Sequence, residues 1–262
     1  AGAVSQIRQY FVDGFYPKGS KRSGPSIKPS GSLLKAVIMN GARSLKGVAG
    51  SSVTTVQPYD SIQGMGRVSL FHSLPLQEAN DLHLQVFDRI AIQDADSHSY
   101  DIDIIQPVAT EHCPLSATLV WSDEPGETLL NDIDLRVSLR GQISFPNGLN
   151  GPDRHNNVER VQLDDIKDGD KVKVKVRAHN LQADYVKYAL VITYCKDRKK
   201  TPTVEPFSAT PTRINTTPDP SPRPTLPPVP STKPTTIQQW RRKERRRKRK
   251  AERKGNRQTL NL

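Results

Sequence analysis

The sequence predicts an α+β chain in which two short amphipathic helices precede an antiparallel β-sandwich and an extended basic tail. Two observations support this prediction. Apolar residues recur every three or four positions up to about residue 45, and every second position from about residue 82. The final quarter of the chain is rich in proline, threonine and positive charge, and it lacks either period.

The two helices are predicted from their apolar spacing. Val4, Ile7, Phe11 and Phe15 form the stripe of a helix that buries one face. The second helix can be capped by Ser30 or Ser32, because a serine hydroxyl accepts a hydrogen bond from an unpaired amide of the first turn. Gly47 and Gly50 are expected to end this helix. Its predicted apolar face consists of Leu34, Val37, Ile38, Ala42 and Leu45.

The strands are predicted from alternation with period two, in which every second side chain points to the same face. At least six such segments follow one another with turn signals such as Asn147-Gly148 between them and no helical pattern. This arrangement predicts an antiparallel sandwich or barrel. The alternating residues are Leu82, Leu84 and Val86; Tyr100, Ile102 and Ile104; Leu115, Ala117, Leu119 and Trp121; Ile133, Leu135, Val137 and Leu139; Val172, Val174 and Val176; and the segment that ends at Tyr194.

The net charge of +12 is concentrated at one end of the chain. Residues 1–197 carry 21 Lys+Arg and 23 Asp+Glu, whereas residues 198–262 carry 18 and 4. The excess charge therefore lies outside the predicted core, which argues against a basic DNA-binding domain. No apolar run approaches the roughly 20 residues that cross a bilayer, so no membrane span is expected.

The tail has two parts. Residues 201–236 hold most of the prolines and are expected to stay extended, since they cannot bury apolar surface. A dense basic run follows, and two interpretations stay open for it: nuclear import or nucleic-acid binding, and binding of polyanions at a surface. The predicted polyanion-binding residues are Arg241, Arg242, Lys243, Arg245, Arg246, Arg247, Lys248, Arg249 and Lys250.

Three ordered motifs in the first 70 residues resemble subtilisin-like serine peptidases. Ala1-Gly2-Ala3-Val4 is similar to the residues that follow the catalytic serine motif in that family. The segment 29–42, with Leu34-Lys35-Ala36 and Asn40-Gly41-Ala42, resembles a later helix. Gln63-Gly64-Met65-Gly66-Arg67-Val68 resembles the closing turn, with Met65 where tryptophan is usual. Because the first helix begins without a capping residue, we also expect this chain to be a piece of a longer protein.

Three later motifs resemble one subtilase subgroup, which has a C-terminal jelly-roll β-domain. They are Leu119-Val120-Trp121-Ser122-Asp123, Leu130-Asn131-Asp132-Ile133-Asp134-Leu135 and Asn156-Asn157-Val158-Glu159. The resemblance implies that residues 1–76 are the C-terminal part of an α/β catalytic domain and that residues 77–197 are the jelly-roll domain. Residues 198–262 would then be a disordered linker and basic tail.

The resemblance implies a secreted serine endopeptidase that cleaves protein or peptide substrates. In subtilases the triad follows the order Asp, His, Ser along the chain. All three residues are therefore expected upstream of residue 1, in a catalytic domain that would be the partner of this chain. No catalytic residue is predicted within the chain itself. The alternative is a non-catalytic β-sandwich binding module anchored by its basic tail.

A calcium site is the one cofactor site that the resemblance favours. From Asp81 to Leu135 there are twelve Asp+Glu and one Lys+Arg, Arg89. Asp132 and Asp134 are two apart in a predicted strand and so share a face, and Asp123 and Asn156 or Asn157 could add oxygen ligands, which Ca²⁺ prefers. Spacing alone favours a solvated acidic surface, whereas the resemblance favours Ca²⁺. The predicted ligands are Asp123, Asp132, Asp134 and Asn157.

A disulfide between Cys113 and Cys195 is our first prediction. Cys113 begins one predicted strand and Cys195 ends the last, and a secreted peptidase would meet oxidising conditions. Closing this loop stabilises the fold by roughly 4–5 kcal/mol in the chain-entropy model. Thiol labelling of denatured, unreduced protein should detect no free cysteine. Two buried free thiols are the alternative, and two labelled cysteines per chain would establish it.

Overall fold

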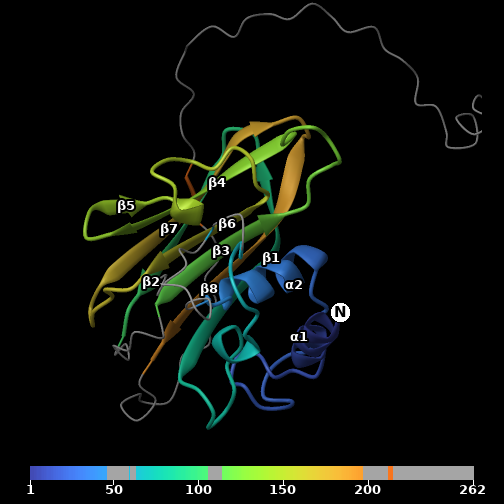
Figure 1. Ribbon diagram of the computed structural model, residues 1–262, viewed down its shortest axis with the longest axis vertical. Coiled ribbons are helices and arrows are strands. Elements are labelled where there is room, and N and C mark those ends of the chain that lie inside the picture. The colour runs from blue at the N-terminus through green and yellow to red at the C-terminus, as the bar shows by residue number, and fades with distance from the viewer. Residues whose placement is uncertain (46–58, 60–62, 106–113, 197–211, 215–262) are drawn as a thin grey trace, which may run out of the picture. The chain divides into compact units, whose positions relative to one another are not determined.

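The computed structural model describes residues 1–45, 59, 63–105, 114–196 and 212–214, all of which lie in one compact unit, Ala1–Thr217 (Figure 1). The helices are α1 (Gly2–Val12) and α2 (Gly31–Asn40), with single 3-10 turns at Leu70–His72 and Pro146–Gly148. The strands are β1 (Leu82–Gln93), β2 (Ser97–Asp103), β3 (Leu115–Trp121), β4 (Asn131–Leu139), β5 (Gln142–Ser144), β6 (Val158–Leu163), β7 (Lys171–Leu181), β8 (Tyr185–Cys195) and β9 (Thr212–Ile214).

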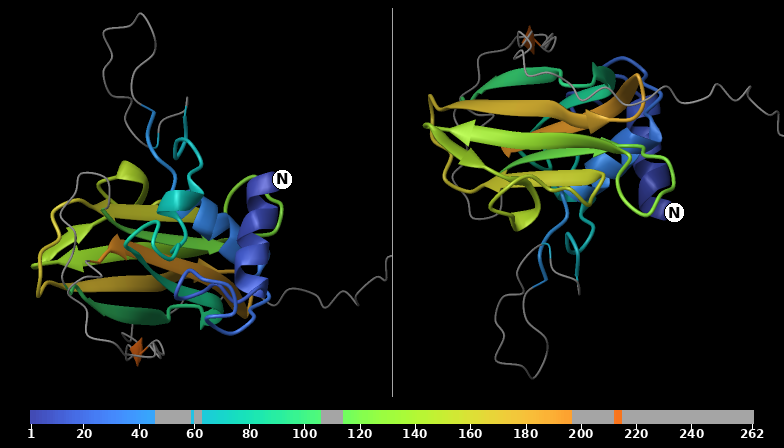
Figure 2. Two further views of the ribbon diagram at one scale, coloured as in Figure 1. Left: turned by 90° about the horizontal axis from the view of Figure 1, so that it is seen from below. Right: turned by 90° about the horizontal axis from the view of Figure 1, so that it is seen from above.

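The strands form two antiparallel sheets, so the predicted β-sandwich is confirmed. One sheet has the order β1-β8-β3-β6 and the other the order β5-β4-β7-β2-β9. Strands β1 to β4 alternate between the two sheets, as do β6, β7 and β8, which is the strand order of a jelly roll with two Greek keys. Figure 2 shows the two sheets stacked, with both helices on the outer side of the β1-β8-β3-β6 sheet.

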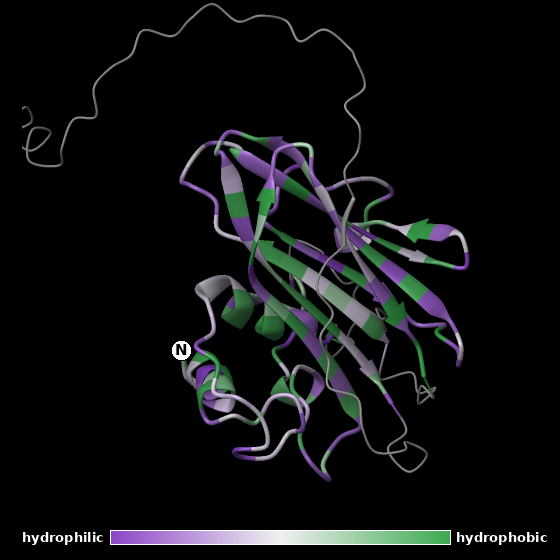
Figure 3. Cartoon of the chain, turned by 180° about the vertical axis from the view of Figure 1, so that it is seen from behind, coloured by the Kyte–Doolittle hydropathy of each residue, from purple (hydrophilic) through white to green (hydrophobic). Residues whose placement is uncertain are grey.

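Two apolar cores hold these layers together. The larger core lies between the sheets, where Leu119, Leu135 and Leu190 are fully buried. The second core lies between the helices and the outer face of the β1-β8-β3-β6 sheet, where Phe11 and Val37 pack with Val120 and Val191. Strand β3 is therefore buried along its whole length, whereas β7 alternates between buried and exposed residues. Figure 3 shows the same alternation as hydrophobic and hydrophilic bands along the strands.

The first helix matches its predicted stripe in part. Ile7 and Phe11 are fully buried and Phe15 packs against the same core, but Val4 is 36% exposed. The helix ends at Val12, so Phe15 reaches the core from the following turn.

The second helix is shorter than predicted, and its buried face matches the predicted one in part: Val37 and Ala42 are buried and Leu34 and Ile38 are partly buried, but Leu45 is 46% exposed. Ser30 caps it, with its hydroxyl accepting the Leu33 amide at 3.0 Å. The helix ends at Asn40 rather than near Leu45, and the buried positions are Leu33, Ala36, Val37 and Asn40. Gly41 follows as the capping residue, where the chain runs so close to Ser73 that any Cβ would overlap it. Gly47 and Gly50 lie outside the described residues.

Polar side chains fix the end of α2 to the sheet. The buried Asn40 amide donates to Thr193 Oγ1 at 2.7 Å, and its carbonyl oxygen accepts from Thr118 Oγ1 at 2.9 Å. Arg160, only 1% exposed, donates to the carbonyl oxygens of Met39 at 2.6 Å and Ala42 at 3.0 Å. These carbonyls lie at the helix C-terminus, where a cation is favourable.

The structure differs from the expected disordered tail at one place. Thr212–Ile214 forms β9 and pairs antiparallel with Ser97–Ser99 of β2. This stretch lies in the longest part of residues 201–220 that contains no proline, and both Thr212 and Ile214 are β-branched, which favours a strand. The predicted boundaries at residues 76 and 197 stay predictions.

The contacts of Asn40 predict a measurable loss of stability in Asn40→Ala. The substitution leaves the hydroxyls of Thr118 and Thr193 without their partner in a buried interface, so the free energy of unfolding should fall by about 2–3 kcal/mol. Urea unfolding followed by circular dichroism measures this difference. Asn150→Ala removes an exposed amide and should change stability by less than about 0.5 kcal/mol. Equal effects of the two substitutions would contradict the anchoring role of Asn40.

Candidate functional site

The acidic residues of β4 contact an arginine, Arg154, that lies outside the predicted set of ligands. Asp132 and Asp134 project from the same face of β4, while Ile133 and Leu135 point into the core, as the spacing predicted. Arg154 reaches both carboxylates with Nη1, at 2.8 Å from Asp132 Oδ2 and 2.5 Å from Asp134 Oδ1. The guanidinium thus supplies the positive charge that two neighbouring carboxylates require.

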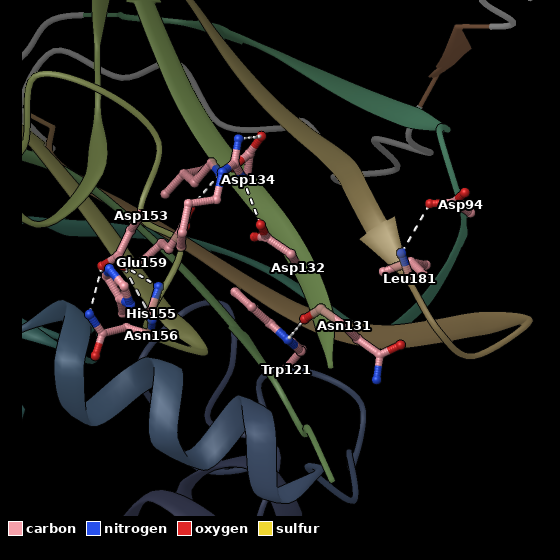
Figure 4. Close-up of polar contacts among 12 residues, drawn as sticks. Asp94, Trp121, Asn131, Asp132, Asp134, Asp153, His155, Asn156, Glu159 and Leu181 are labelled. Carbon is pink, nitrogen blue, oxygen red and sulfur yellow. Dashed lines mark hydrogen bonds and ion pairs between the residues drawn. The ribbon is translucent and has the colours of Figure 1, made fainter. Parts of the chain in front are cut away.

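Arg154 is held in place by the loop that carries it. Asp153, 1% exposed, accepts the backbone amides of His155 at 2.9 Å and Asn156 at 3.2 Å through Oδ1. Its other oxygen accepts the side-chain amides of Asn147 and Asn156. Burial raises the pKa of Asp153, but these hydrogen bonds outweigh it and hold the pKa below its usual value. The loop between the 3-10 turn Pro146–Gly148 and β6 is therefore organised around an ionised carboxylate, Asp153 (Figure 4).

A fourth carboxylate, that of Glu159, is fully buried on β6. Its Oε2 accepts the backbone amide of Leu135 on β4 at 2.5 Å, so it joins the two sheets at their edge. Oε1 has no hydrogen-bond partner among the described residues. Burial raises the pKa of Glu159 well above its usual value, and the charges of Asp134, Asp153 and Asp132 raise it further. Such a carboxyl group is most stable in its neutral form.

The remaining predicted calcium ligands make contacts of a different kind. Asp123 accepts the Leu130 amide at 2.8 Å and the Asn131 side-chain amide at 2.8 Å. Asn131 in turn accepts the amides of Gln182 and Ala183, so Asp123 supports a turn. Asn157 accepts a hydrogen bond from Lys35 Nζ at 3.1 Å. The structure thus brings Asp132 and Asp134 to a common partner and commits Asp123 and Asn157 to other contacts.

The donor set around β4 does not fit a calcium ion as the residues stand. Across the part of the chain that the structure describes, no group of three or more His, Cys, Asp or Glu side chains is arranged to hold a metal. An ion at Asp132 and Asp134 would have to displace Arg154, so calcium binding stays a prediction. Arg154 could not be found from local spacing, because it follows Asp134 by 20 residues in a loop.

The other predicted site residues lie mostly outside the described residues. Cys195 is the last residue of β8, but Cys113 is outside them, and the disulfide stays a prediction. The basic run at residues 241–250 is also outside them. No helix among the described residues is long and apolar enough to cross a membrane.

Together, the fold and the site define an antiparallel β-sandwich with two helices packed on one sheet and a buried acidic cluster at the sandwich edge. No family model matches the chain. It is 26% identical over 212 residues to a Dictyostelium discoideum protein named serine protease/ABC transporter B family protein tagA. The match covers 72% of this chain and 11% of that protein. Two further serine protease/ABC transporter B family proteins of the same organism also match this chain. It is 39% identical to tagD over 80 residues and 32% identical to tagB over 88 residues.

These relatives support a loose relation to serine proteases. The matches to tagD and tagB cover 29% and 30% of this chain and 4% and 5% of those proteins. The chain thus spans about a tenth or less of the length of the curated relatives it matches.

The Arg154 contacts predict how the β4 carboxylates respond to its removal. Arg154→Gln should lower the free energy of unfolding by about 1–2 kcal/mol, since Asp132 and Asp134 then repel without a counter-charge; partial exposure of Arg154 limits the effect. Adding Asp132→Asn should restore most of the loss, which thermal unfolding measures.

Millimolar Ca²⁺ tests the calcium prediction in the same assay. A melting temperature that is higher in Ca²⁺ than in chelator, with the difference abolished by Asp132→Ala plus Asp134→Ala, would support it.

The environment of Glu159 predicts a specific pH dependence of stability. Because its pKa is higher in the folded than in the unfolded chain, the folded state retains a proton that the unfolded state releases above about pH 4.5. The free energy of unfolding of the native protein should therefore decline, relative to Glu159→Gln, as the pH rises from about 4.5 through the raised pKa. Glu124→Gln, at an exposed carboxylate, is the control and should show no such trend. A pH-independent difference between native protein and Glu159→Gln would contradict the buried neutral carboxyl.

Proposed function

We propose that this chain is the C-terminal part of a secreted subtilisin-like serine endopeptidase, with the Asp/His/Ser triad in a segment N-terminal to it. The observation that supports this most directly is that the named relatives and the ordered motifs both point to serine peptidases. The relatives are named as serine proteases, and the motifs at residues 1–4, 29–42 and 63–68 occur in the order that resembles subtilases.

In this proposal α1 and α2 belong to the catalytic domain. The serine that attacks the peptide carbonyl would precede α1, with histidine as its base and aspartate orienting the histidine. The described contacts support a stabilising role for the sandwich in this proposal. Phe11 and Val37 are buried against the β1-β8-β3-β6 sheet, and Asn40 is hydrogen-bonded to two of its strands. The sandwich would therefore stabilise the helix that follows the nucleophile.

The alternative proposal is a non-catalytic β-sandwich module whose basic tail binds polyanions. The charge of residues 241–250 favours it. Upstream sequence separates the two proposals, because a Gly-Thr-Ser motif in the complete protein, with its serine eight residues before Gly2, belongs to a peptidase.

A peptidase assay tests the proposed function. This chain alone should hydrolyse casein no faster than a boiled control, because the proposed triad is upstream of it. The longer protein that includes the upstream segment should hydrolyse casein and be blocked by a serine-directed phosphonate. Substituting alanine for the upstream serine is the matched control. Inhibitor-sensitive activity of this chain alone, or an inactive longer protein, would refute the proposal.

A further inference from the structure

A cavity of about 470 Å³ lies where the first turn of α2 meets the outer face of the β1-β8-β3-β6 sheet. All four strands of this sheet or the loops next to them contribute to its lining. Its volume falls in the range of small-molecule sites in proteins. The lining residues are Ser30, Gly31, Ser32, Lys35, Arg89, Val120, Trp121, Ser122, Asn157, Lys187 and Tyr188.

Three cationic side chains line this cavity, and no carboxylate does. Lys35 comes from α2, Arg89 from β1 and Lys187 from β8, so the fold assembles them from distant parts of the chain. Among the described residues, neither Lys35 nor Lys187 forms an ion pair. The hydrogen bond from Lys35 goes to a neutral acceptor, Asn157 Oδ1. Three positive charges around one cavity repel one another unless an anion lies between them.

Arg89 is the only one of the three cations with an acidic partner in the described structure. Its Nη1 donates to Asp88 Oδ2 at 2.7 Å and to the Lys28 carbonyl oxygen at 2.9 Å. Asp88 is itself occupied, because its oxygens also accept the hydroxyl and the amide of Ser30. This carboxylate therefore fixes the α2 cap and does not neutralise Lys35 or Lys187.

We propose that this cavity binds an anion of the phosphate class, either as the free ion or as the phosphate group of a small organic molecule. Its charged side chains are all hydrogen-bond donors, and the hydroxyls of Ser32 and Ser122 can donate as well. A tetrahedral anion with several acceptor oxygens can satisfy donors that converge from different elements. The site is separate from the acidic cluster at β4, and it does not depend on the proposed peptidase activity.

Trp121 provides a reporter for this binding, since it borders the cavity, its indole is buried in the core between the sheets, and the chain has only one other tryptophan, Trp240. In full-length Trp240→Phe protein, inorganic phosphate should change Trp121 emission saturably at constant ionic strength and should raise the melting temperature. Chloride at the same ionic strength should do neither. Glucose 6-phosphate distinguishes the two sources: tighter binding than inorganic phosphate identifies a carried phosphate group, and equal or weaker binding identifies the free ion.

Three single substitutions in the same background test the assignment of the residues. Lys187→Gln and Lys35→Gln should each weaken phosphate binding at least tenfold. Lys171→Gln removes an exposed lysine of β7 in the other sheet and should leave binding unchanged. The proposal is overturned if emission and melting temperature are both insensitive to the two phosphates, if chloride reproduces the response, or if the three variants behave alike.

Discussion

The position of α2 depends on a small polar contact buried between a helix and a sheet. Asn40 satisfies Thr193 on β8 and Thr118 on β3 at once, and the Asn40 backbone carbonyl accepts from Ser116 Oγ at 3.2 Å. Because these groups are removed from water, any displacement of the helix would leave them unpaired at a cost of about 1–3 kcal/mol each. The apolar core alone would tolerate sliding of α2, whereas these hydrogen bonds select one register.

Arg160 gives the same junction its electrostatic character. A buried guanidinium usually requires a carboxylate, but here the carbonyl oxygens of Met39 and Ala42 and the hydroxyl oxygen of Tyr59 accept its hydrogen bonds. Its neighbour on β6, Glu159, is buried on the opposite side of the strand and does not pair with the Arg160 guanidinium. Two adjacent residues of β6 thus stabilise two different interfaces. Arg160 holds α2 to its sheet, and Glu159 joins that sheet to β4.

The sequence was sufficient to predict strands that bury one face. It was least informative for strands that bury both faces. The alternation at β7 predicted which residues face the core, because its other face carries exposed lysines. On β3, Ser116 and Thr118 read as solvent-facing, yet both are buried beneath α2. Strand β6 was not predicted from periodicity, because Glu159 and Arg160 interrupt the alternation of apolar residues. Both are nevertheless buried. Burial of polar residues against a partner element leaves no local pattern.

The same limit explains the outcome for the acidic residues. Period two placed Asp132 and Asp134 correctly on one face, but it gave no sign of the cation that pairs with them, Arg154. The identity of that cation depends on a loop 20 residues away, whose shape is set by the hydrogen bonds of Asp153 rather than by any periodic signal. The cations of the cavity beside α2 show the reverse arrangement, in which Lys35, Arg89 and Lys187 converge and, among the described residues, only Arg89 has a carboxylate partner, Asp88. The folded unit therefore pairs Asp132 and Asp134 with a cation of its own, whereas Lys35 and Lys187 border an open cavity that can admit an anion.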